Sequence, residues 1–348
     1  MSGEISDLVM MKYSFLDKIK FRSGGSHLKM ALPVLLCSFF LCGCGQKIDN
    51  QYDINMGLMR MNSVNTSLTE SVHADGFSTG LAIPGDASYN VDDITAEAAL
   101  LVKYDDSDPA VIAYKNPYVR TYPASITKVM SALVCLRHVS DLSQEFQITE
   151  NSTINMLGSS RAWLRKGETL TIEDLLYGML LPSGNDAAIA VAEATCGSVD
   201  AFVDEMNKTA LEIGATGTHF VNPHGLPDDD HYTTPYDIYL IMREAFKYDE
   251  FRKIVSTARY NPKYKDSNGV AKTQEWQDTN KYLLGEVETP EGLKVLGGKT
   301  GTTNSAGYCL TMNTQKESTG EEFIGAIMKA ESKDDLYNNM TNLILKIR

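Results

Sequence analysis

The sequence predicts an α+β fold in which helices flank an antiparallel sheet of about five strands. The first observation is the order of its patterns: short apolar runs, a helical block, apolar runs again, and one last helix. The second is composition, because 43% hydrophobic and 22% charged residues in a chain of 348 are ordinary values for a protein with a buried core. Strands on both sides of the helical block are expected to meet in one sheet.

Five apolar runs are expected to form the strands of this sheet. The first two, 97–103 and 110–114, flank the turn-rich stretch 105–109 and predict a hairpin. Three more follow the helical block: 293–300, 307–314 and 323–329. The polar stretch 316–322 separates the last two and is expected to turn the chain.

Helical periodicity and capping residues define the middle of this region. From Ser125 to about His138, apolar residues recur at the spacing of a helical turn. Three later helices are predicted from their first residues: Thr171 with Asp174 three positions on, Ser198, and Thr234 with Pro235. The last helix has an apolar face: Leu336, Met340, Leu343, Ile344 and Ile347.

The N-terminus is typical of an exported protein, and residues 1–43 are predicted to be a lipoprotein signal peptide. The mostly apolar run Met30–Cys44 is shorter than the roughly 20 residues that span a bilayer and matches the apolar core of a signal peptide. Its end, Leu-Cys-Gly-Cys, resembles a bacterial lipobox, in which cleavage precedes the last cysteine and Cys44 would receive acyl chains. The alternative is a buried helix with incidental cysteines.

The residues after the lipobox are expected to tether a folded domain to the membrane surface. Residues 44–94 lack sustained periodicity and are rich in Asn, Ser, Asp and Gly, as in a flexible linker. The folded domain is expected to occupy 95–348. Three cysteines remain in it, each in an apolar segment and without metal-site spacing, so buried free thiols are expected: Cys135, Cys196 and Cys309.

The net charge argues against a nucleic-acid partner. At −13, the surface of the protein repels phosphate backbones. The chain also has no G-x-G-x-x-G or Walker loop, and none of its Cys/His spacings suggests a zinc knuckle. Neither nucleic acid nor nucleotides are therefore expected as partners.

The first of three motifs that carry chemistry is Ser-Ile-Thr-Lys, from Ser125 to Lys128. If Ser125 opens a helix, Lys128 lies one turn along on the same face, within reach of the hydroxyl. A serine needs a neighbouring base, and a lysine kept partly neutral by burial or by another cation can serve. The helix N-terminus also favours developing negative charge. The alternative is a capped helix with a surface lysine.

The second motif is Ser-Gly-Asn, from Ser183 to Asn185, directly after Pro182. It falls between two helical segments, where a loop can project a hydroxyl and an amide into a cleft. Ser183 could relay a proton to a leaving nitrogen, and Asn185 could bind a substrate carbonyl. The alternative is an ordinary turn.

The third motif is Lys-Thr-Gly, from Lys299 to Gly301, at the end of the strand predicted from residue 293. Gly301 would let a substrate backbone approach the strand edge, where a peptide could pair by strand addition. Lys299 and Thr300 would then meet the carboxylate of that peptide. The alternative is a strand end with a solvated lysine.

In this order, S-x-x-K, S-x-N and K-T-G resemble the signature of penicillin-binding proteins and class A β-lactamases. Ser183 follows Ser125 by 58 residues, and Lys299 follows Ser183 by 116. Several segments are similar to the D-alanyl-D-alanine carboxypeptidases in particular: 123–125, 181–188, 220–226, 231–234 and 299–301. The resemblance runs from about 96 to 348, and it implies a β-lactamase/transpeptidase-like fold with 95–348 as the catalytic domain.

The resemblance implies a serine-type D-Ala-D-Ala carboxypeptidase that acts on peptidoglycan stem peptides. Ser125 would attack the carbonyl between the two terminal D-alanines, and Lys128 would take its proton. Ser183 would pass a proton to the departing D-alanine, while Asn185 would hold the substrate. Water would then hydrolyse the acyl-enzyme.

The third motif is implied to bind substrate. Lys299 would supply positive potential beside Thr300 and Gly301, and the N–H groups of Ser125 and Thr302 would form the oxyanion hole. The resemblance implies no metal and no organic cofactor. β-Lactams should acylate the same serine. With a lipid on the N-terminal cysteine, the protein is expected in the bacterial cell envelope, outside the cytoplasm and anchored to the membrane.

Two other functions remain open. One is a β-lactamase, although class A enzymes have Asp where this chain has Gly184, and the stretch 212–222 offers no matching Glu-x-x-x-Asn. The other is a non-catalytic wall-binding or β-lactam-sensing lipoprotein. Better-known family members also carry a β-rich C-terminal domain with an amphipathic membrane anchor, which is absent from this sequence and which the N-terminal lipid is expected to replace.

Histidines and tryptophans outside the motifs receive structural interpretations. The segment with His219, His224, His231 and residues 228–230 is predicted to be a structural loop near the cleft. The alternative is that these residues form a zinc site. Trp163 and Trp276 are expected to be packing residues.

Overall fold

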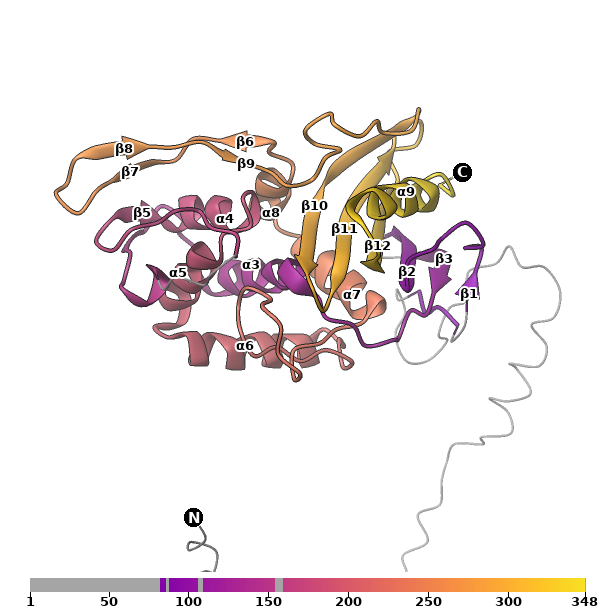
Figure 1. Ribbon diagram of the computed structural model, residues 1–348, viewed down its shortest axis with the longest axis horizontal. Coiled ribbons are helices and arrows are strands. Elements are labelled where there is room, and N and C mark those ends of the chain that lie inside the picture. The colour runs from indigo at the N-terminus through magenta and orange to yellow at the C-terminus, as the bar shows by residue number, and fades with distance from the viewer. Residues whose placement is uncertain (1–81, 86–87, 106–108, 154–158, 348) are drawn as a thin grey trace, which may run out of the picture. The chain divides into compact units, whose positions relative to one another are not determined.

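The computed structural model describes residues 82–85, 88–105, 109–153 and 159–347 (Figure 1). The predicted signal peptide, the lipobox with Cys44, and most of the predicted tether lie outside these residues. None of the described helices is both long and apolar enough to cross a membrane.

The two ends of the described chain meet in a six-stranded antiparallel sheet (Figure 1). Its strands lie side by side in the order β1 (Ser88–Tyr89), β3 (Ala110–Lys115), β2 (Ala98–Tyr104), β12 (Glu322–Ala330), β11 (Gly307–Lys316) and β10 (Leu293–Thr303). All five predicted strands are present, each ending within about three residues of its predicted bounds. The predicted α+β fold with an antiparallel sheet is confirmed.

The folded region begins before its predicted start at residue 95. Strand β1 pairs with β3, with Ser88 opposite Lys115. Val91 and Ile94 are buried in the hydrophobic cluster beneath the sheet. These two apolar residues stand isolated among polar ones and form no periodic pattern, so composition alone assigned them to a linker.

Helices cover both faces of the sheet. Their bounds are η1 (Ala124–Ile126), α3 (Thr127–His138), η2 (Asn151–Thr153), α4 (Ile172–Leu180), α5 (Asn185–Cys196), α6 (Val199–Glu212), α7 (Pro235–Ala245), α8 (Asp249–Val255) and α9 (Lys333–Ile344). Alternate residues of β2 face opposite ways: Leu100 belongs to the cluster with α3 and α7, and Leu101 to the cluster with α9. The predicted caps Thr171, Ser198 and Thr234 each accept a backbone N–H of the first turn.

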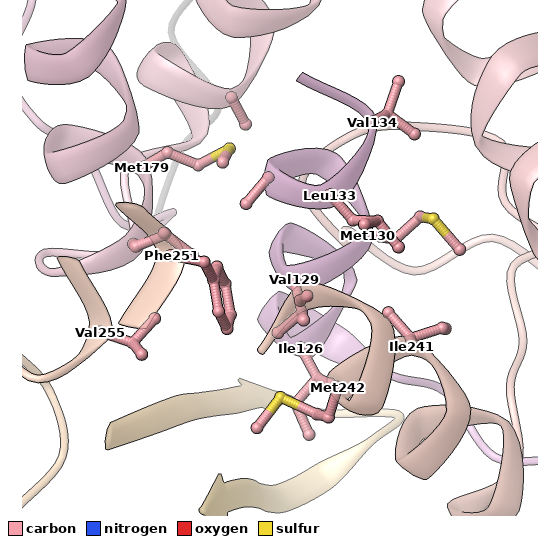
Figure 2. Packing of buried hydrophobic residues seen from close by; sticks show 14 of the residues in the cluster. Ile126, Val129, Met130, Leu133, Val134, Met179, Ile241, Met242, Phe251 and Val255 are labelled. Carbon is pink, nitrogen blue, oxygen red and sulfur yellow. The ribbon is translucent and has the colours of Figure 1, made fainter. Parts of the chain in front are cut away.

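Helix α3 runs through the centre of the larger hydrophobic cluster (Figure 2). Its residues from Thr127 to Leu136 are all buried, and Val129, Met130 and Leu133 contact side chains of neighbouring helices. A helix that is enclosed on every side belongs to the core rather than to the surface. The polar side chains on it, Lys128 among them, are therefore held in a dry environment.

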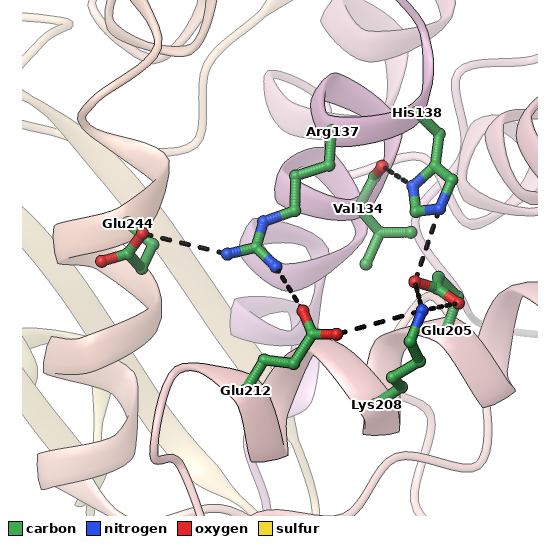
Figure 3. Close-up of polar contacts among 7 residues, drawn as sticks. All are labelled: Val134, Arg137, His138, Glu205, Lys208, Glu212 and Glu244. Carbon is green, nitrogen blue, oxygen red and sulfur yellow. Dashed lines mark hydrogen bonds and ion pairs between the residues drawn. The ribbon is translucent and has the colours of Figure 1, made fainter.

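Charged residues fix the far end of α3 (Figure 3). The Arg137 guanidinium lies 3.0 Å from a carboxylate oxygen of Glu212 on α6 and 3.9 Å from one of Glu244 on α7. His138 lies 3.4 Å from Glu205, also on α6. Cations in the last turn also complement the helix dipole, so this cluster orients the helix that carries Lys128.

Two small sheets complete the fold and were not predicted. One has the order β4 (Glu145–Gln147), β5 (Thr169–Thr171), β7 (Lys263–Lys265) and β8 (Ala271–Thr273), and the other pairs β6 (Arg259–Tyr260) with β9 (Trp276–Gln277). Their strands are two or three residues long and mostly polar, so they give no alternating apolar signal. Of the three cysteines in this region, Cys135 and Cys309 are buried free thiols, as predicted, whereas Cys196 is half-buried.

Candidate active site

Ser125 lies in a 3-10 turn rather than at the first residue of an α-helix. Helix α3 begins two residues later, and Ala124 adopts a left-handed backbone with φ of +48°. The 3-10 turn still brings residues three apart onto one side of the chain. The Nζ atom of Lys128 consequently lies 2.9 Å from the Oγ atom of Ser125.

Lys128 is fully buried and has three polar neighbours. Besides Ser125, its Nζ donates to Oδ1 of Asn185 and to the carbonyl oxygen of His224, both at 2.8 Å. Both of these oxygens can only accept, so the two hydrogens of a neutral amine satisfy them and leave its lone pair for the Ser125 hydroxyl proton. Burial, and next the charge of Lys299, lower the pKa of Lys128 well below its usual value.

The second motif forms the loop between α4 and α5, as its position between two helical segments predicted. Ser183 is buried and has φ of +63°, an unusual conformation for a residue with a side chain. Among the described residues, no group lies within hydrogen-bonding distance of its Oγ atom. Asn185 opens α5, and its backbone N–H donates to the carbonyl of Ser160 at 3.0 Å.

Gly184 occupies a space that no side chain fits. A Cβ atom there would lie 2.7 Å from the backbone nitrogen of Ala162 and 2.7 Å from the carbonyl oxygen of Gly178. The aspartate that class A β-lactamases carry at this motif position is thus incompatible with this backbone.

The third motif lies on β10, the edge strand of the sheet. Lys299 is buried, and burial lowers its pKa to about 8, although the Asp278 carboxylate acts in the opposite direction. Burial likewise raises the pKa of Asp278 to about 7, and Lys299 opposes that shift. The hydroxyl of Thr300 lies 2.5 Å from that of Thr279. Residues 278 and 279 therefore interact with two successive residues of the motif, Lys299 and Thr300. The sequence carries no pattern that singles out Asp278.

Gly301 lies against the turn that carries the nucleophile. A Cβ atom on Gly301 would stand 2.9 Å from the carbonyl oxygen of Pro123 and 3.1 Å from the backbone nitrogen of Ser125. The close approach that we expected between a substrate and Gly301 is therefore made by the chain itself. This approach brings β10 beside the Ser125 N–H, and Thr302, the next residue of the strand, is exposed.

A cleft of about 420 Å³ collects one residue from each of the first two motifs and the residue that follows the third. Ser125, Asn185 and Thr302 line it, together with Gly225, Pro227 and Asn304. Lys128, Ser183 and Lys299 are buried rather than exposed to this cleft. The cleft therefore presents a nucleophile, an amide and a strand edge, with two buried amines close to them.

The loop 219–231 contributes more than its predicted structural role. Its His224 carbonyl fixes Lys128, and a Cβ on Gly225 would meet the carbonyl oxygen of Ala124. His231 accepts the backbone N–H of Val221 at Nδ1, so its Nε2–H donates to the hydroxyl of Thr127 at 2.8 Å. The sequence predicted this loop near the cleft but not these contacts, because every residue has a backbone carbonyl and the residue type does not show which carbonyl is used.

The histidines proposed as an alternative zinc site are used in other ways. Burial lowers the pKa of His224 to about 3 and that of His231 to about 4, so both are neutral at physiological pH. His219 contacts the carbonyl oxygen of Asp230 through Nδ1. Within the described ranges, no three His, Cys, Asp or Glu side chains are grouped so that they could hold a metal ion.

Comparison with known proteins adds independent evidence. The family model described as D-alanyl-D-alanine carboxypeptidase matches residues 86–332. The chain is similar to D-alanyl-D-alanine carboxypeptidase DacF of Bacillus subtilis, with 34% identity over 64% of this chain, and to DacA of Escherichia coli K12, with 32% identity over 70%. The matched segments span 54% and 58% of these two relatives, little more than half of their length.

Solved structures agree with this comparison. The crystal structure of the Streptomyces K15 DD-transpeptidase superposes with a TM-score of 0.67 and 28% sequence identity. The superposition covers 73% of this chain and 97% of that one.

Proposed function

The chain belongs to the D-alanyl-D-alanine carboxypeptidase family, and from this we propose that it is a serine-type carboxypeptidase that removes the terminal D-alanine from peptidoglycan stem peptides. One observation carries the proposal: the buried, low-pKa amine of Lys128 lies 2.9 Å from the Ser125 hydroxyl. A neutral amine in this position is the base that a serine nucleophile requires.

In the first half-reaction, Ser125 Oγ attacks the carbonyl carbon of the penultimate D-alanine, and its proton passes to Lys128. The backbone N–H groups of Ser125 and Thr302 stabilise the oxyanion that forms. The C–N bond then breaks, and the leaving amine takes a proton through the Ser183 hydroxyl. D-Alanine leaves, and an ester joins the remaining peptide to Ser125. Among the described residues the buried Ser183 Oγ has no hydrogen-bond partner, so its hydroxyl is available for a bound substrate.

In the second half-reaction, water attacks the ester carbonyl and gives a proton to Lys128. The ester C–O bond breaks, and Ser125 recovers its hydroxyl proton from the lysine. Asn185 holds the carbonyl of the bound peptide while its own Oδ1 positions Lys128. No step requires a metal or an organic cofactor.

The edge position of β10 supports binding of an extended peptide. In the six-stranded sheet β10 has a single neighbour, β11, so no described strand pairs with its other edge, and an extended peptide could add there. Lys299 and Thr300, with the backbone of Gly301 and Thr302, would then bind the terminal carboxylate. The positive charge of Lys299 provides the potential that this anion requires.

The same serine is proposed to react with β-lactams. A purified protein of residues 45–348 should be labelled covalently by a fluorescent penicillin, and Ser125→Ala should remove the label without unfolding. The fold of the variant can be checked by circular dichroism. Labelling of the variant at the wild-type level, or a label mapped to Ser183, would contradict the assignment of the nucleophile.

Steady-state kinetics separate this proposal from a β-lactamase. Steady release of D-alanine from a diacyl-Lys-D-Ala-D-Ala peptide is expected, and a β-lactam should give about one equivalent of burst followed by slow deacylation. The reason is that departing D-alanine leaves room for water, whereas the opened β-lactam keeps its leaving group tethered. Rapid cephalosporin turnover without D-alanine release would favour a β-lactamase, and a folded protein that does neither would favour a binding or sensing lipoprotein.

The protein is further proposed to be held at the cell envelope by lipid on Cys44. The lipobox-like segment supports this, and so does a peptidoglycan substrate, which lies outside the cytoplasm.

A further inference from the structure

Trp163 is exposed, so the prediction that it is a packing residue is wrong. Its side chain is 69% exposed, whereas Trp276, the other tryptophan, is 2% exposed and packs as predicted. The neighbours Ala162 and Leu164 are both buried. The residues on both sides of Trp163 are therefore buried, while its indole ring points into the solvent.

The backbone of Trp163 is held in a strained conformation. Its φ is +62°, which is an outlier for a bulky residue. The buried carboxylate of Asp186 accepts the N–H groups on both sides of it, from Ala162 at 2.8 Å and from Leu164 at 3.1 Å. The carbonyl of Ala162 accepts the indole N–H of buried Trp276 at 3.0 Å. Strain that the surrounding structure fixes in this way points to function.

The exposed indole lies beside the proposed active site. It lines a hollow of about 220 Å³ whose wall also includes Ser159 and Asn185. Ser159 and Asn185 also line the cleft that contains Ser125. The two hollows are therefore adjacent, and Asp186, which holds Trp163, follows Asn185 directly in α5.

A third hollow continues on the other side of Trp163. It measures about 460 Å³, within the usual range of ligand sites, and residues of the β7–β8 hairpin line it, including Tyr264 and Lys272. Trp163 and Arg165 line both this hollow and the one beside the cleft. A long substrate that leaves the cleft would thus pass over the indole.

The side chains around Trp163 suit an uncharged ligand that has a ring and many polar groups. Arg161 lies over the indole at 5.4 Å from the ring centre. The hollow under the hairpin is lined by cations and anions alike, including Lys166, Glu168 and Asp266. Such mixed donors and acceptors suit hydroxyl and acetamido groups better than a strong anion, while a flat indole suits an apolar ring face.

We propose that Trp163, with Arg161, forms a subsite for the glycan of peptidoglycan, the acetylated amino sugars to which the stem peptides are attached. This inference rests on the proposed function, which supplies the polymer. The indole stacks on a sugar ring face, and the guanidinium donates to acetamido or hydroxyl oxygens. The enzyme thereby prefers peptides that are still joined to glycan.

The test compares two substrates that differ only in the sugar: a disaccharide-pentapeptide and the same pentapeptide without the disaccharide. Trp163→Ala retains a Cβ atom, so the backbone preference at this position changes little. For the sugar-bearing substrate KM should rise about fivefold to tenfold with kcat unchanged. For the sugar-free peptide both constants should equal those of the wild type. Trp163→Phe should restore most of the loss because it keeps a flat aromatic face.

Leu211→Ala is the matched control, because Leu211 on α6 is 68% exposed, almost as much as Trp163. This control should leave KM for both substrates unchanged. An equal rise of KM for both substrates would overturn the glycan subsite in favour of peptide binding, and no rise for either would overturn it outright.

A direct binding measurement keeps this test separate from the proposed function. Isothermal titration calorimetry with a disaccharide-tripeptide, which lacks D-Ala-D-Ala, reports on the subsite without turnover and without relying on the Trp163 indole as the reporter. Binding that Trp163→Phe keeps and Trp163→Ala loses supports the subsite even if the wild type releases no D-alanine. Absence of such binding in a wild type that does release D-alanine overturns the subsite and leaves the carboxypeptidase assignment intact.

Discussion

Gly225 lies so close to Ala124 that a Cβ atom on Gly225 would stand 1.8 Å from the Ala124 carbonyl oxygen. Gly225 also has φ of +89°, a conformation that other residues rarely adopt. The loop 219–231 thus packs directly on the turn that carries Ser125. The position of the nucleophile depends on this glycine as much as on its own helix.

Gly225→Ala is therefore expected to abolish penicillin labelling and to lower the free energy of unfolding by about 2 kcal/mol or more. Gly269→Ala is the control: Gly269 has φ of +79°, but nothing lies within 4 Å of its added Cβ. It should lose only about 1 kcal/mol and keep full activity. Urea unfolding with the labelling assay measures both, and equal activity in the two variants would contradict the proposed contact.

Ser183→Gly should make the protein more stable and less active. The left-handed backbone at Ser183 suits glycine, so the free energy of unfolding should rise by about 1 kcal/mol. Loss of the proton relay should lower kcat about 10²-fold to 10⁴-fold. Asn90→Gly, at an exposed position with φ of +55°, should change neither quantity appreciably. Unchanged kcat in Ser183→Gly would remove Ser183 from the mechanism.

Acylation by penicillin should become faster as pH rises and Lys128 loses its proton. Because burial and the charge of Lys299 lower the pKa of Lys128, this rise should occur well below the pH at which an ordinary lysine titrates. Lys299→Gln removes one of these causes, so the rise should move to higher pH. Lys128→Arg, which stays charged, should lose about 10²-fold to 10⁴-fold in rate. Stopped-flow rates across the neutral and alkaline range test this, and identical profiles for wild type and Lys299→Gln would refute it.

Asp278→Asn should change how stability depends on pH. The pKa of Asp278 is about 7 in the folded protein, above its usual value of 3.8, so between these values the folded state binds a proton that the unfolded chain has lost. This contribution to stability is present at low pH and is lost as pH rises through about 7. The free energy of unfolding of the wild type, relative to the variant, should fall by at least about 1 kcal/mol over this interval. Parallel stability curves from chemical denaturation would show that the carboxyl group is not protonated in this way.

Cys44→Ala should block lipidation and leave a precursor with an uncleaved or wrongly cleaved signal. One acyl chain binds membranes only marginally and several hold firmly, so the variant should also leave the membrane fraction. Incorporation of labelled fatty acid, followed by mass spectrometry of the N-terminus, measures the outcome. Equal incorporation into wild type and variant would exclude Cys44 as the lipid site.

Local signals made the main elements of the fold predictable. Thr171 with Asp174 marked the start of α4, because a helix cap needs only residues three apart. Strand β1 could not be found in this way, since two residues carry no periodicity and its pairing with β3 is a tertiary contact. The same holds for the short strands around β7.

The candidate site residues that act through their side chains could be predicted from the sequence. The backbone contacts and conformations that position them could not. Ser125, Lys128, Ser183, Asn185 and Lys299 were named because their residue types form a known order of motifs. In the structure Ser125 and Asn185 line one cleft, and Lys128 contacts both of them. The His224 carbonyl was missed, because any residue supplies a carbonyl. Trp163 was expected to be a packing residue, and its exposure depends on the carboxylate of Asp186 in α5, which holds the backbone on both sides of it.

The pairing of β2 with β12 determines when during synthesis this protein can finish folding. These two strands are central in the sheet, with Ala98 opposite Met328, so nearly the whole catalytic region separates two partners that must meet. Contacts of such high contact order form slowly, because the entropy of closing a long loop is lost before pairing compensates. A chain that emerges N-terminus first cannot complete its core until β12 has followed. If the protein is exported as proposed, this unfolded interval keeps the polypeptide able to pass through an export channel, and the proposed active site can form only where the last strand is delivered.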